Sequence, residues 1–276
     1  MLKQRVITGI FVACVVAGIL FFTPALVFIL FVSAVVAVAT WEWSNLSSIK
    51  FLPFRLLYLC AMLGAGMAVW FWQSRVGELP LVGILSIAGA WWAVALLWVQ
   101  SYPASVILWR SPITRLVIGF LVIWPAWLSL VVLRDMPNGK ALVAIVVLLV
   151  AAADICAYFA GRAFGKNKLA PQVSPGKSWE GVLGGVLGAM LVSVGLAFYL
   201  GSSNWIIPLL IAIPTALVSV LGDLLESMMK RHRGIKDSGR ILPGHGGMLD
   251  RIDGLVAAAP VFTLAVLATG WSFPGL

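Results

Sequence analysis

Long runs of apolar residues, separated by short polar breaks, occupy most of this chain. A helix needs about 20 mostly apolar residues to cross a lipid bilayer, and nine runs approach that length. The nine runs lie at about Val6–Phe22, Ala25–Thr40, Phe54–Trp72, Leu79–Gln100, Leu116–Leu133, Ala141–Ala160, Gly181–Leu200, Trp205–Leu221 and Leu255–Trp271. This pattern predicts an all-α fold: a polytopic integral membrane helical bundle of about nine transmembrane helices.

The composition agrees with a membrane protein and argues against a soluble one. Hydrophobic residues make up 62% of the 276 residues and charged residues only 11%, whereas soluble domains carry about 25% charged residues. The first apolar run lacks a small-residue cleavage site, so we interpret it as a membrane helix rather than a signal peptide. The cysteines Cys14, Cys60 and Cys156 stand alone in apolar runs and suggest neither a disulfide nor a metal site.

The basic residues predict the orientation of the chain. With the N-terminus placed in the cytoplasm, sixteen Lys and Arg residues fall on the cytoplasmic side, and only Arg75, Arg134 and Lys140 fall on the far side. Cytoplasmic loops of membrane proteins are enriched in Lys and Arg, so the N-terminus is expected in the cytoplasm and the C-terminus outside. Orientation and contact with anionic lipid headgroups explain the net charge of +9, and we expect no nucleic-acid partner.

The polar residues divide the chain into two parts. Residues 1–110 contain the first four predicted helices, and residues 111–276 form a C-terminal transmembrane region, which we expect to be the catalytic one because the polar residues gather there. This second region carries two long polar loops, 161–180 and 222–254, and the predicted orientation places both in the cytoplasm. Because the two loops share one face of the membrane, they can converge on a single site.

The segment from Asp223 to Asp253 is the densest polar stretch. It holds five of the ten acidic and six of the nineteen basic residues, although a charge at membrane depth costs about 3 kcal/mol or more. If the eighth helix continues beyond its apolar run, Asp223, Ser227 and Lys230 share one face. The glycines that follow can form an anion-binding nest of backbone N–H groups, and Asp250 comes after them.

This mixture of residue types favours a metal-assisted phosphate site. Mg²⁺ prefers carboxylate and phosphate oxygens, Lys and Arg bind phosphates, and no cluster of Cys and His competes for zinc. The alternative is a juxtamembrane loop whose charges pair with one another and with lipid headgroups. Acidic residues at helix ends and the density of glycine favour the first interpretation.

A second group of polar residues lies upstream. Asp154 falls within the sixth apolar run, where an ionisable residue is a functional candidate by default. The loop after it carries Arg162, Lys166 and Lys177 among glycines. Residues 174–178 resemble a phosphate loop only loosely, because the Walker spacing is absent. In the alternative interpretation Asp154 pairs with a basic side chain for structural reasons, and the basic residues bind anionic lipid.

The late polar segment resembles the signature of phosphatidate cytidylyltransferases, also called CDP-diacylglycerol synthases. The residues that carry the resemblance are Ser227-x2-Lys230-Arg231-x4-Lys236-Asp237-x-Gly239-x2-Leu242-Pro243-Gly244-His245-Gly246-Gly247-x2-Asp250-Arg251-x-Asp253. Two upstream patterns are also similar to that family: Asp154-x2-Ala157-Tyr158 and Ser174-Pro175-x-Lys177-Ser178-x-Glu180-Gly181. The resemblance is specific over about 140–254, whereas over roughly 1–110 it rests on hydropathy alone.

The resemblance implies a homodimeric, multi-helix enzyme of phospholipid biosynthesis. Its place would be the cytoplasmic (inner) membrane of a bacterium, with the active site facing the cytoplasm. Its substrates would be CTP and phosphatidic acid, its products CDP-diacylglycerol and pyrophosphate, and its cofactor Mg²⁺, as one or two cations.

Together, the resemblance and the residue chemistry suggest roles for individual side chains. Asp223 and Asp250 are the expected metal ligands. The expected catalytic residues are Asp223, Ser227, Lys230, Arg231, Lys236, Asp237, His245, Asp250 and Asp253. The expected substrate-binding residues are Asp154, Arg162, Lys166, Ser174, Lys177, Ser178, Glu180, Gly244, Gly246, Gly247 and Arg251.

The expected reaction is nucleotidyl transfer, in which a phosphate oxygen of phosphatidic acid attacks the α-phosphorus of CTP. That oxygen is already ionised near neutral pH, because a phosphate monoester has a second pKa of about 6. We therefore expect His245 to contact phosphate rather than to act as an obligatory base. Two alternatives stay open: a CTP-dependent kinase of a lipid alcohol such as a polyprenol, and an anion transporter, which would place its polar groups near the membrane midplane.

Overall fold

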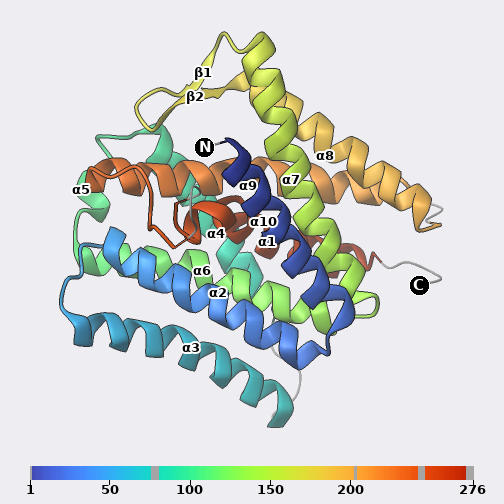
Figure 1. The fold of residues 1–276 in the computed structure, drawn as a ribbon, viewed down its shortest axis with the longest axis horizontal. Helices are drawn as coiled ribbons and strands as arrows, with labels where there is room; N and C mark the ends of the chain where they lie inside the picture. Colours follow the sequence, from blue (N-terminus) through green and yellow to red (C-terminus); the bar gives the residue numbers. More distant parts are fainter. Residues whose placement is uncertain (1, 76–80, 202–203, 242–245, 272–276) are drawn as a thin grey trace.

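The computed structural model describes residues 2–75, 81–201, 204–241 and 246–271. Its helices and strands follow one another in the order α1 (Leu2–Phe22), α2 (Ala25–Leu46), α3 (Leu52–Arg75), α4 (Leu81–Gln100), α5 (Val106–Trp109), α6 (Pro112–Asp135), α7 (Gly139–Phe164), β1 (Lys168–Ala170), β2 (Ser174–Ser178), α8 (Trp179–Tyr199), α9 (Ile206–Arg233) and α10 (Leu249–Thr269). The chain is therefore a helical bundle with one small two-stranded antiparallel sheet (Figure 1).

The helices confirm the prediction of a polytopic membrane bundle. Among the described residues, eight helices are long and apolar enough to cross a membrane, and α1 contains a shorter apolar helical stretch, Ile7–Phe22. Each predicted run corresponds to one of these nine helices, because the hydropathy of each run is sustained over a membrane thickness. The four-residue α5 was not predicted, since it is too short to show a period.

Both predicted polar loops are shorter in the structure. In the first, α7 continues to Phe164 and a β-hairpin fills most of the remainder. The second, predicted at 222–254, extends only from residue 234 to 248, because α9 continues to Arg233 and α10 begins at Leu249. The extension of α9 is stabilised by burial of apolar side chains such as Leu224, Leu225 and Met228 against the rest of the bundle.

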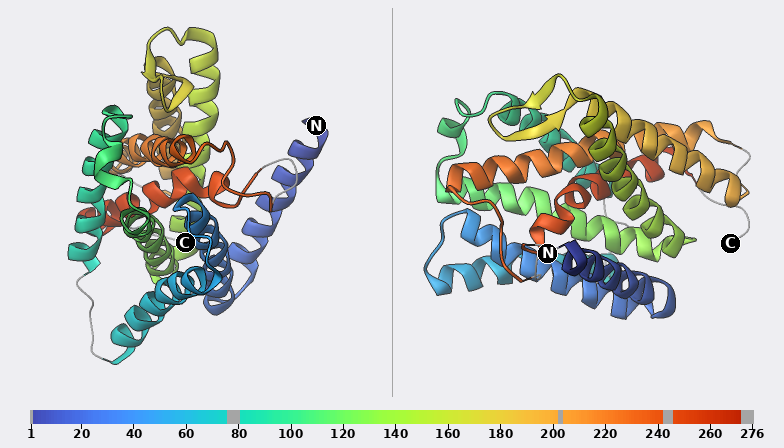
Figure 2. Two further views of the ribbon diagram at one scale, coloured as in Figure 1. Left: turned by 90° about the vertical axis from the view of Figure 1, so that its left-hand side faces the viewer. Right: turned by 45° about the horizontal axis from the view of Figure 1, so that its top comes forward.

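Helix pairs with small residues at their contacts build the part of the bundle that carries the polar segments. At Gly184 and Gly188 of α8, a side chain would collide with Ala160 and Cys156 of α7. Small residues allow helix backbones to approach closely in membrane proteins. Helix α10 packs against α9, α6, α4 and α7. The α7–α8 pair and its hairpin extend from one side of the bundle, while α3 lies at the opposite side (Figures 1 and 2).

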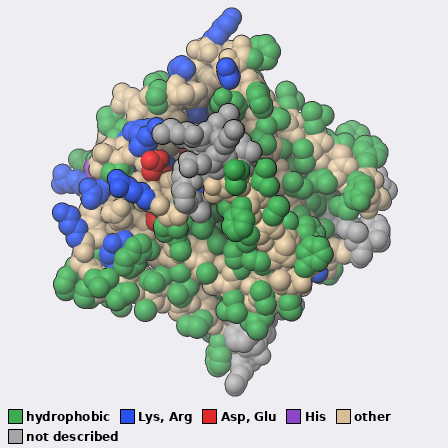
Figure 3. Space-filling model, in the orientation of Figure 1, with side chains coloured by type: hydrophobic (Ala, Val, Ile, Leu, Met, Phe, Trp, Pro, Cys, Tyr) green, Lys and Arg blue, Asp and Glu red, His purple; other side chains and the backbone are tan. Residues whose placement is uncertain are grey.

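The exterior separates an apolar surface from a basic one. Large apolar side chains such as Phe22, Leu191 and Ile113 are exposed, which suits a surface that faces lipid. Figure 3 shows apolar side chains over the lower and right-hand surface, and Lys and Arg gathered at the upper left around a few acids. On this face of the molecule, the charged side chains therefore concentrate at one end.

Candidate functional site

A cavity of about 430 Å³ opens where the two polar segments meet. Its walls come from α7, the β2 strand, the start of α8 and the middle of α9. The lining residues are Asp154, Ala157, Tyr158, Gly161, Arg162, Ser174, Gly176, Lys177, Ser178, Gly181, Val182, Val220 and Asp223. The structure thus brings together six of the predicted site residues, from both polar segments, around one space.

Lys177 and Asp223 connect the two segments directly. The Lys177 ammonium lies 2.7 Å from Oδ2 of Asp223 and 3.4 Å from the Val220 carbonyl oxygen. One turn further along α9, the Ser227 hydroxyl donates a hydrogen bond of 3.1 Å to Oδ1 of Asp223. The predicted shared face of Asp223 and Ser227 is confirmed by this contact, because α9 remains helical beyond its apolar run.

The hairpin is fixed in place by the start of α8. Ser178 is the N-cap residue of that helix, and its hydroxyl accepts the N–H of Gly181. The Glu180 carboxylate accepts the backbone N–H groups of Lys166 and Asn167, at 3.1 and 3.2 Å. Ser178 and Glu180 therefore hold the loop that carries Lys177 above α9, while the Lys166 side chain is exposed.

A contact at the end of α9 joins the hairpin to the second segment once more. The Arg231 Nε donates a hydrogen bond of 3.2 Å to the carbonyl oxygen of Val173, which is buried at the hairpin turn. Asp154 and Arg162 project from α7 into the same cavity, and the Arg162 guanidinium lies 3.4 Å from the Tyr158 hydroxyl. The two polar segments consequently share one end of the bundle, as expected.

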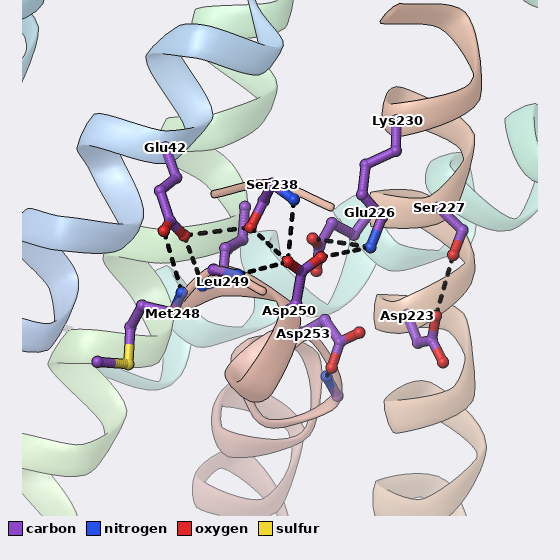
Figure 4. A network of polar contacts seen from close by, with 12 residues as sticks. Glu42, Asp223, Glu226, Ser227, Lys230, Ser238, Met248, Leu249, Asp250 and Asp253 are labelled. Atoms are coloured by element: carbon purple, nitrogen blue, oxygen red, sulfur yellow. Dashed lines mark hydrogen bonds and ion pairs between the residues drawn. The ribbon is translucent and has the colours of Figure 1, made fainter. Parts of the chain in front are cut away.

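Beside the cavity, Lys230 lies at the centre of a buried network that Figure 4 shows from close by. Its ammonium is 2.7 Å from Oδ1 of Asp250 and 3.1 Å from Oε1 of Glu226. The other oxygen of Asp250, Oδ2, accepts the backbone N–H groups of Ser238 and Gly247, at 2.9 and 2.8 Å. In this structure the N–H of Gly247, from the glycine-rich loop, therefore binds the Asp250 carboxylate, and binding of a phosphate by this loop stays a prediction.

Glu226 and Asp253 complete a group of acids between α9 and α10. Glu226 is 2% exposed; its Oε1 forms the ion pair with Lys230, and its Oε2 has no hydrogen-bond partner among the described residues. Asp253 accepts the N–H of Gly254 and interacts electrostatically with both Glu226 and Asp223. With Asp250, four carboxylates face two ammonium groups, those of Lys177 and Lys230, so this region carries an excess of negative charge.

The donor chemistry of these acids fits a hard divalent cation. Carboxylate oxygens are ligands that Mg²⁺ prefers, and Oε2 of Glu226 is buried without a hydrogen-bond partner among the described residues. Within the described part of the chain, no three Asp, Glu, His or Cys side chains form a ready-made metal site. Mg²⁺ is commonly held by only one or two carboxylates, with waters and substrate phosphates as its other ligands, so a complete protein cage is not required.

Glu42 is a component of the network that the sequence analysis missed. It belongs to α2, in the part of the chain to which we had assigned no chemistry, and it is 3% exposed. Its carboxylate accepts the backbone N–H groups of Met248 and Leu249 at the start of α10. An acid with no basic neighbour three or four residues away on its own helix was the available signal, since such a charge must find partners elsewhere.

The remaining predicted residues lie around this centre. Lys236, Asp237 and Arg251 are exposed. Gly246 adopts a φ of +86°, which a residue with a side chain would rarely adopt. The predictions for Gly244 and His245 fall outside the described residues.

Comparisons with known proteins give a consistent result. A family model described as "Cytidylyltransferase family" matches residues 3–269. The phosphatidate cytidylyltransferase of Pseudomonas aeruginosa is 43% identical over 276 residues, which cover 99% of this chain and 100% of that protein. The Haemophilus influenzae enzyme of the same name is 41% identical over 283 residues, covering 95% and 98%. A Mycobacterium tuberculosis relative, also named phosphatidate cytidylyltransferase, is 32% identical over 273 residues, covering 94% and 80%.

Proposed function

Because the chain belongs to the cytidylyltransferase family, we propose that it transfers the cytidylyl group of CTP to phosphatidic acid. The products are CDP-diacylglycerol and pyrophosphate. The observation that carries the proposal is the cavity in which Lys177 from the hairpin meets Asp223 and Asp154 from membrane helices. Such a site can meet a water-soluble triphosphate from one side and a lipid phosphate from the other.

The phosphate-binding groups of the proposed site are distributed over both polar segments. Lys177, Arg162 and Ser174 line the cavity, and Lys230 and Arg231 lie at the end of α9. Ammonium and guanidinium groups neutralise phosphate charge, and the guanidinium does so with a bidentate fork. These residues therefore hold the lipid phosphate and the triphosphate in positions that allow them to react.

In the proposed reaction, a phosphate oxygen of phosphatidic acid forms a bond to the α-phosphorus of CTP. The bond between the α-phosphorus and the oxygen that bridges to the β-phosphorus breaks, and pyrophosphate leaves with that oxygen. The nucleophile is already ionised, so orientation and charge neutralisation supply most of the acceleration. The chain's part in the reaction is to align the two phosphates and to hold them apart from bulk water.

The acids between α9 and α10 are the proposed place for Mg²⁺. Asp223 and Asp250 are the proposed ligands, and Asp253, Glu226 and Asp237 support them. One or two bound cations would supply positive charge that neutralises phosphate oxygens as charge develops on them. The buried Oε2 of Glu226 supports the proposal, because the Lys230 ammonium pairs with Oε1 and is shared with Asp250. One ammonium does not balance two buried carboxylates, and a cation can compensate the remaining negative charge.

The location and assembly belong to the same proposal. We place the protein in the cytoplasmic membrane of a bacterium, with the cavity facing the cytoplasm, because Lys and Arg concentrate at that end of the bundle. Residues 111–276 carry the chemistry, and residues 1–110 form the N-terminal helices. A homodimer is the proposed assembly, on the family resemblance alone.

The products of purified protein supplied with CTP, phosphatidic acid and Mg²⁺ test the function. Label in the α-phosphate of CTP should move into the lipid fraction, and label in the γ-phosphate should appear in pyrophosphate. A CTP-dependent lipid kinase, given a lipid alcohol, would instead put the γ-label into lipid and release CDP. Transfer of the γ-label, or no lipid product at all, would contradict the proposal.

A further inference from the structure

Glu42 binds the start of α10 from a helix that lies about two hundred residues earlier in the sequence. The backbone N–H groups of Met248 and Leu249 lie 3.0 and 2.8 Å from its carboxylate oxygens. The Ser238 hydroxyl lies 3.2 Å from Oε2 of Glu42. All three partners belong to the loop and helix start that carry Asp250.

The contact replaces a missing local cap. Met248 is the N-cap residue of α10, and its own side chain makes no capping hydrogen bond. The first N–H groups of a helix have no partner within the helix, and a carboxylate there also interacts favourably with the helix dipole. Glu42 supplies both effects from α2, so the place where α10 begins depends on it.

The loop is also shaped around this side chain. A Cβ at Gly239 would collide with the Glu42 carboxylate, and one at Gly247 would lie 2.6 Å from its Oε2. Only glycine lets the backbone pass this close on two sides of a buried carboxylate. Gly247 in turn donates its N–H to Oδ2 of Asp250, so the stretch that encloses Glu42 also orients Asp250.

Ser238 links the two carboxylates. Its hydroxyl lies 3.0 Å from Oδ2 of Asp250 and 3.2 Å from Oε2 of Glu42, and its backbone N–H donates to Asp250 (Figure 4). A hydroxyl has a single proton to donate, so it can serve either acid but not both at once. A displacement of Glu42 therefore changes the hydrogen bonds of Asp250 directly.

We infer that Glu42 is a positioning residue, which sets the orientation of Asp250 and the position of the α10 start. The inference rests on the proposed function for its effect on turnover. It gives the N-terminal helices a defined part in the site: α2 holds the acid that α10 presents to Lys230 and the α9 acids.

The test compares purified full-length wild type with Glu42→Gln, Glu42→Asp and Ser44→Ala. Gln keeps the size of the side chain, but it removes the charge and replaces one acceptor oxygen with an NH₂ group. Asp keeps the charge on a side chain that is one methylene group shorter. Ser44 is the matched control, since it is buried on the same helix and bonds instead to Trp41 and Arg55. Three quantities are measured: turnover, the half-saturating Mg²⁺ concentration, and hydrogen exchange of a peptide that spans residues 246–252.

For Glu42→Gln we expect turnover to fall and the half-saturating Mg²⁺ concentration to rise. The ratio of turnover to half-saturating Mg²⁺ should fall by about 10- to 100-fold. We also expect faster exchange in residues 246–252, with an unfolding midpoint near that of the wild type. Glu42→Asp should give values between those of the wild type and Glu42→Gln. If Glu42→Gln does not fold, Glu42→Asp takes its place in the comparison. Ser44→Ala should match the wild type in all three measurements.

Two outcomes would overturn the inference. One is a folded Glu42 variant with wild-type turnover, Mg²⁺ dependence and hydrogen exchange. The other is a loss of turnover that follows a lower unfolding midpoint while Mg²⁺ dependence and exchange stay unchanged. A wild-type protein that converts no CTP would refute the proposed function instead. The hydrogen-exchange comparison would still show whether Glu42 holds the start of α10 in place.

Discussion

The Lys177 ammonium lies 2.7 Å from the Asp223 carboxylate, and this pair joins the β-hairpin to the middle of α9. The two side chains are 24% and 34% exposed, so water reaches the pair through the cavity. A partly hydrated ion pair is weak, and its partners can therefore be exchanged for others. In the proposed reaction Lys177 would bind a substrate phosphate, and Asp223 would hold the cation.

We predict that Lys177→Met lowers kcat/KM by about 100-fold or more, because it removes a positive charge aimed at phosphate in a sheltered site. Lys177→Arg should keep part of the rate, since the charge remains while its geometry changes. Lys168→Met is the matched control, as Lys168 is an exposed lysine of the same hairpin. Steady-state rates with varied CTP and phosphatidic acid measure the effect, and equal losses in Lys177→Met and Lys168→Met would contradict it.

Glu226→Gln should lower turnover by about 10-fold or more without lowering the unfolding midpoint in the presence of EDTA. The amide keeps the shape of a buried side chain and removes a charge that lies close to Asp250 and Asp253 and pairs with Lys230. In the metal-free protein the relief of like-charge repulsion offsets the lost ion pair, because Lys230 keeps its pair with Asp250. Turnover loses a group that supports the cation.

Thermal unfolding in detergent and the CTP assay measure the two halves of this prediction. Asp135→Asn is the control, because Asp135 is an exposed acid at the other end of the bundle. A Glu226→Gln protein that unfolds several degrees earlier and turns over normally would show that Glu226 only stabilises the fold.

The proposed orientation predicts which positions an impermeant thiol reagent reaches from outside the cell. In a variant without the native cysteines, Asp135→Cys should be labelled, and Gln172→Cys should be labelled only after the membrane is permeabilised. Both positions are exposed, so the difference reports the side of the membrane. Labelling of position 172 in intact cells would contradict the proposed topology.

The sequence was sufficient to predict the helices and the meeting of the two polar segments. Membrane helices are specified by sustained hydropathy, which is a local property. The Asp223–Ser227 hydrogen bond was also predictable, because a spacing of four residues places two side chains on one helix face. The actual ends of α9 and α10 were not, since they depend on burial and on a cap from a distant helix.

Glu42 and Glu226 show why the rest of the site was missed. Glu42 is a lone acid near two tryptophans, and its partners lie about two hundred residues away. No local period reports such a long-range contact. Glu226 is a helical neighbour of Lys230 in the sequence, but the burial of its carboxylate, with Oε2 left without a hydrogen bond, appears only once α9 and α10 are packed together.

Turnover of Asp223→Asn in the assay with CTP, phosphatidic acid and Mg²⁺ tests the central claim most directly. Asn keeps the shape of the side chain and its bond to Ser227, but it removes the charge that faces Lys177 and the proposed cation. The account predicts a folded protein in which the transfer of α-labelled cytidylate to lipid falls by about 100-fold or more. A folded Asp223→Asn protein that forms lipid product at the wild-type rate would contradict it.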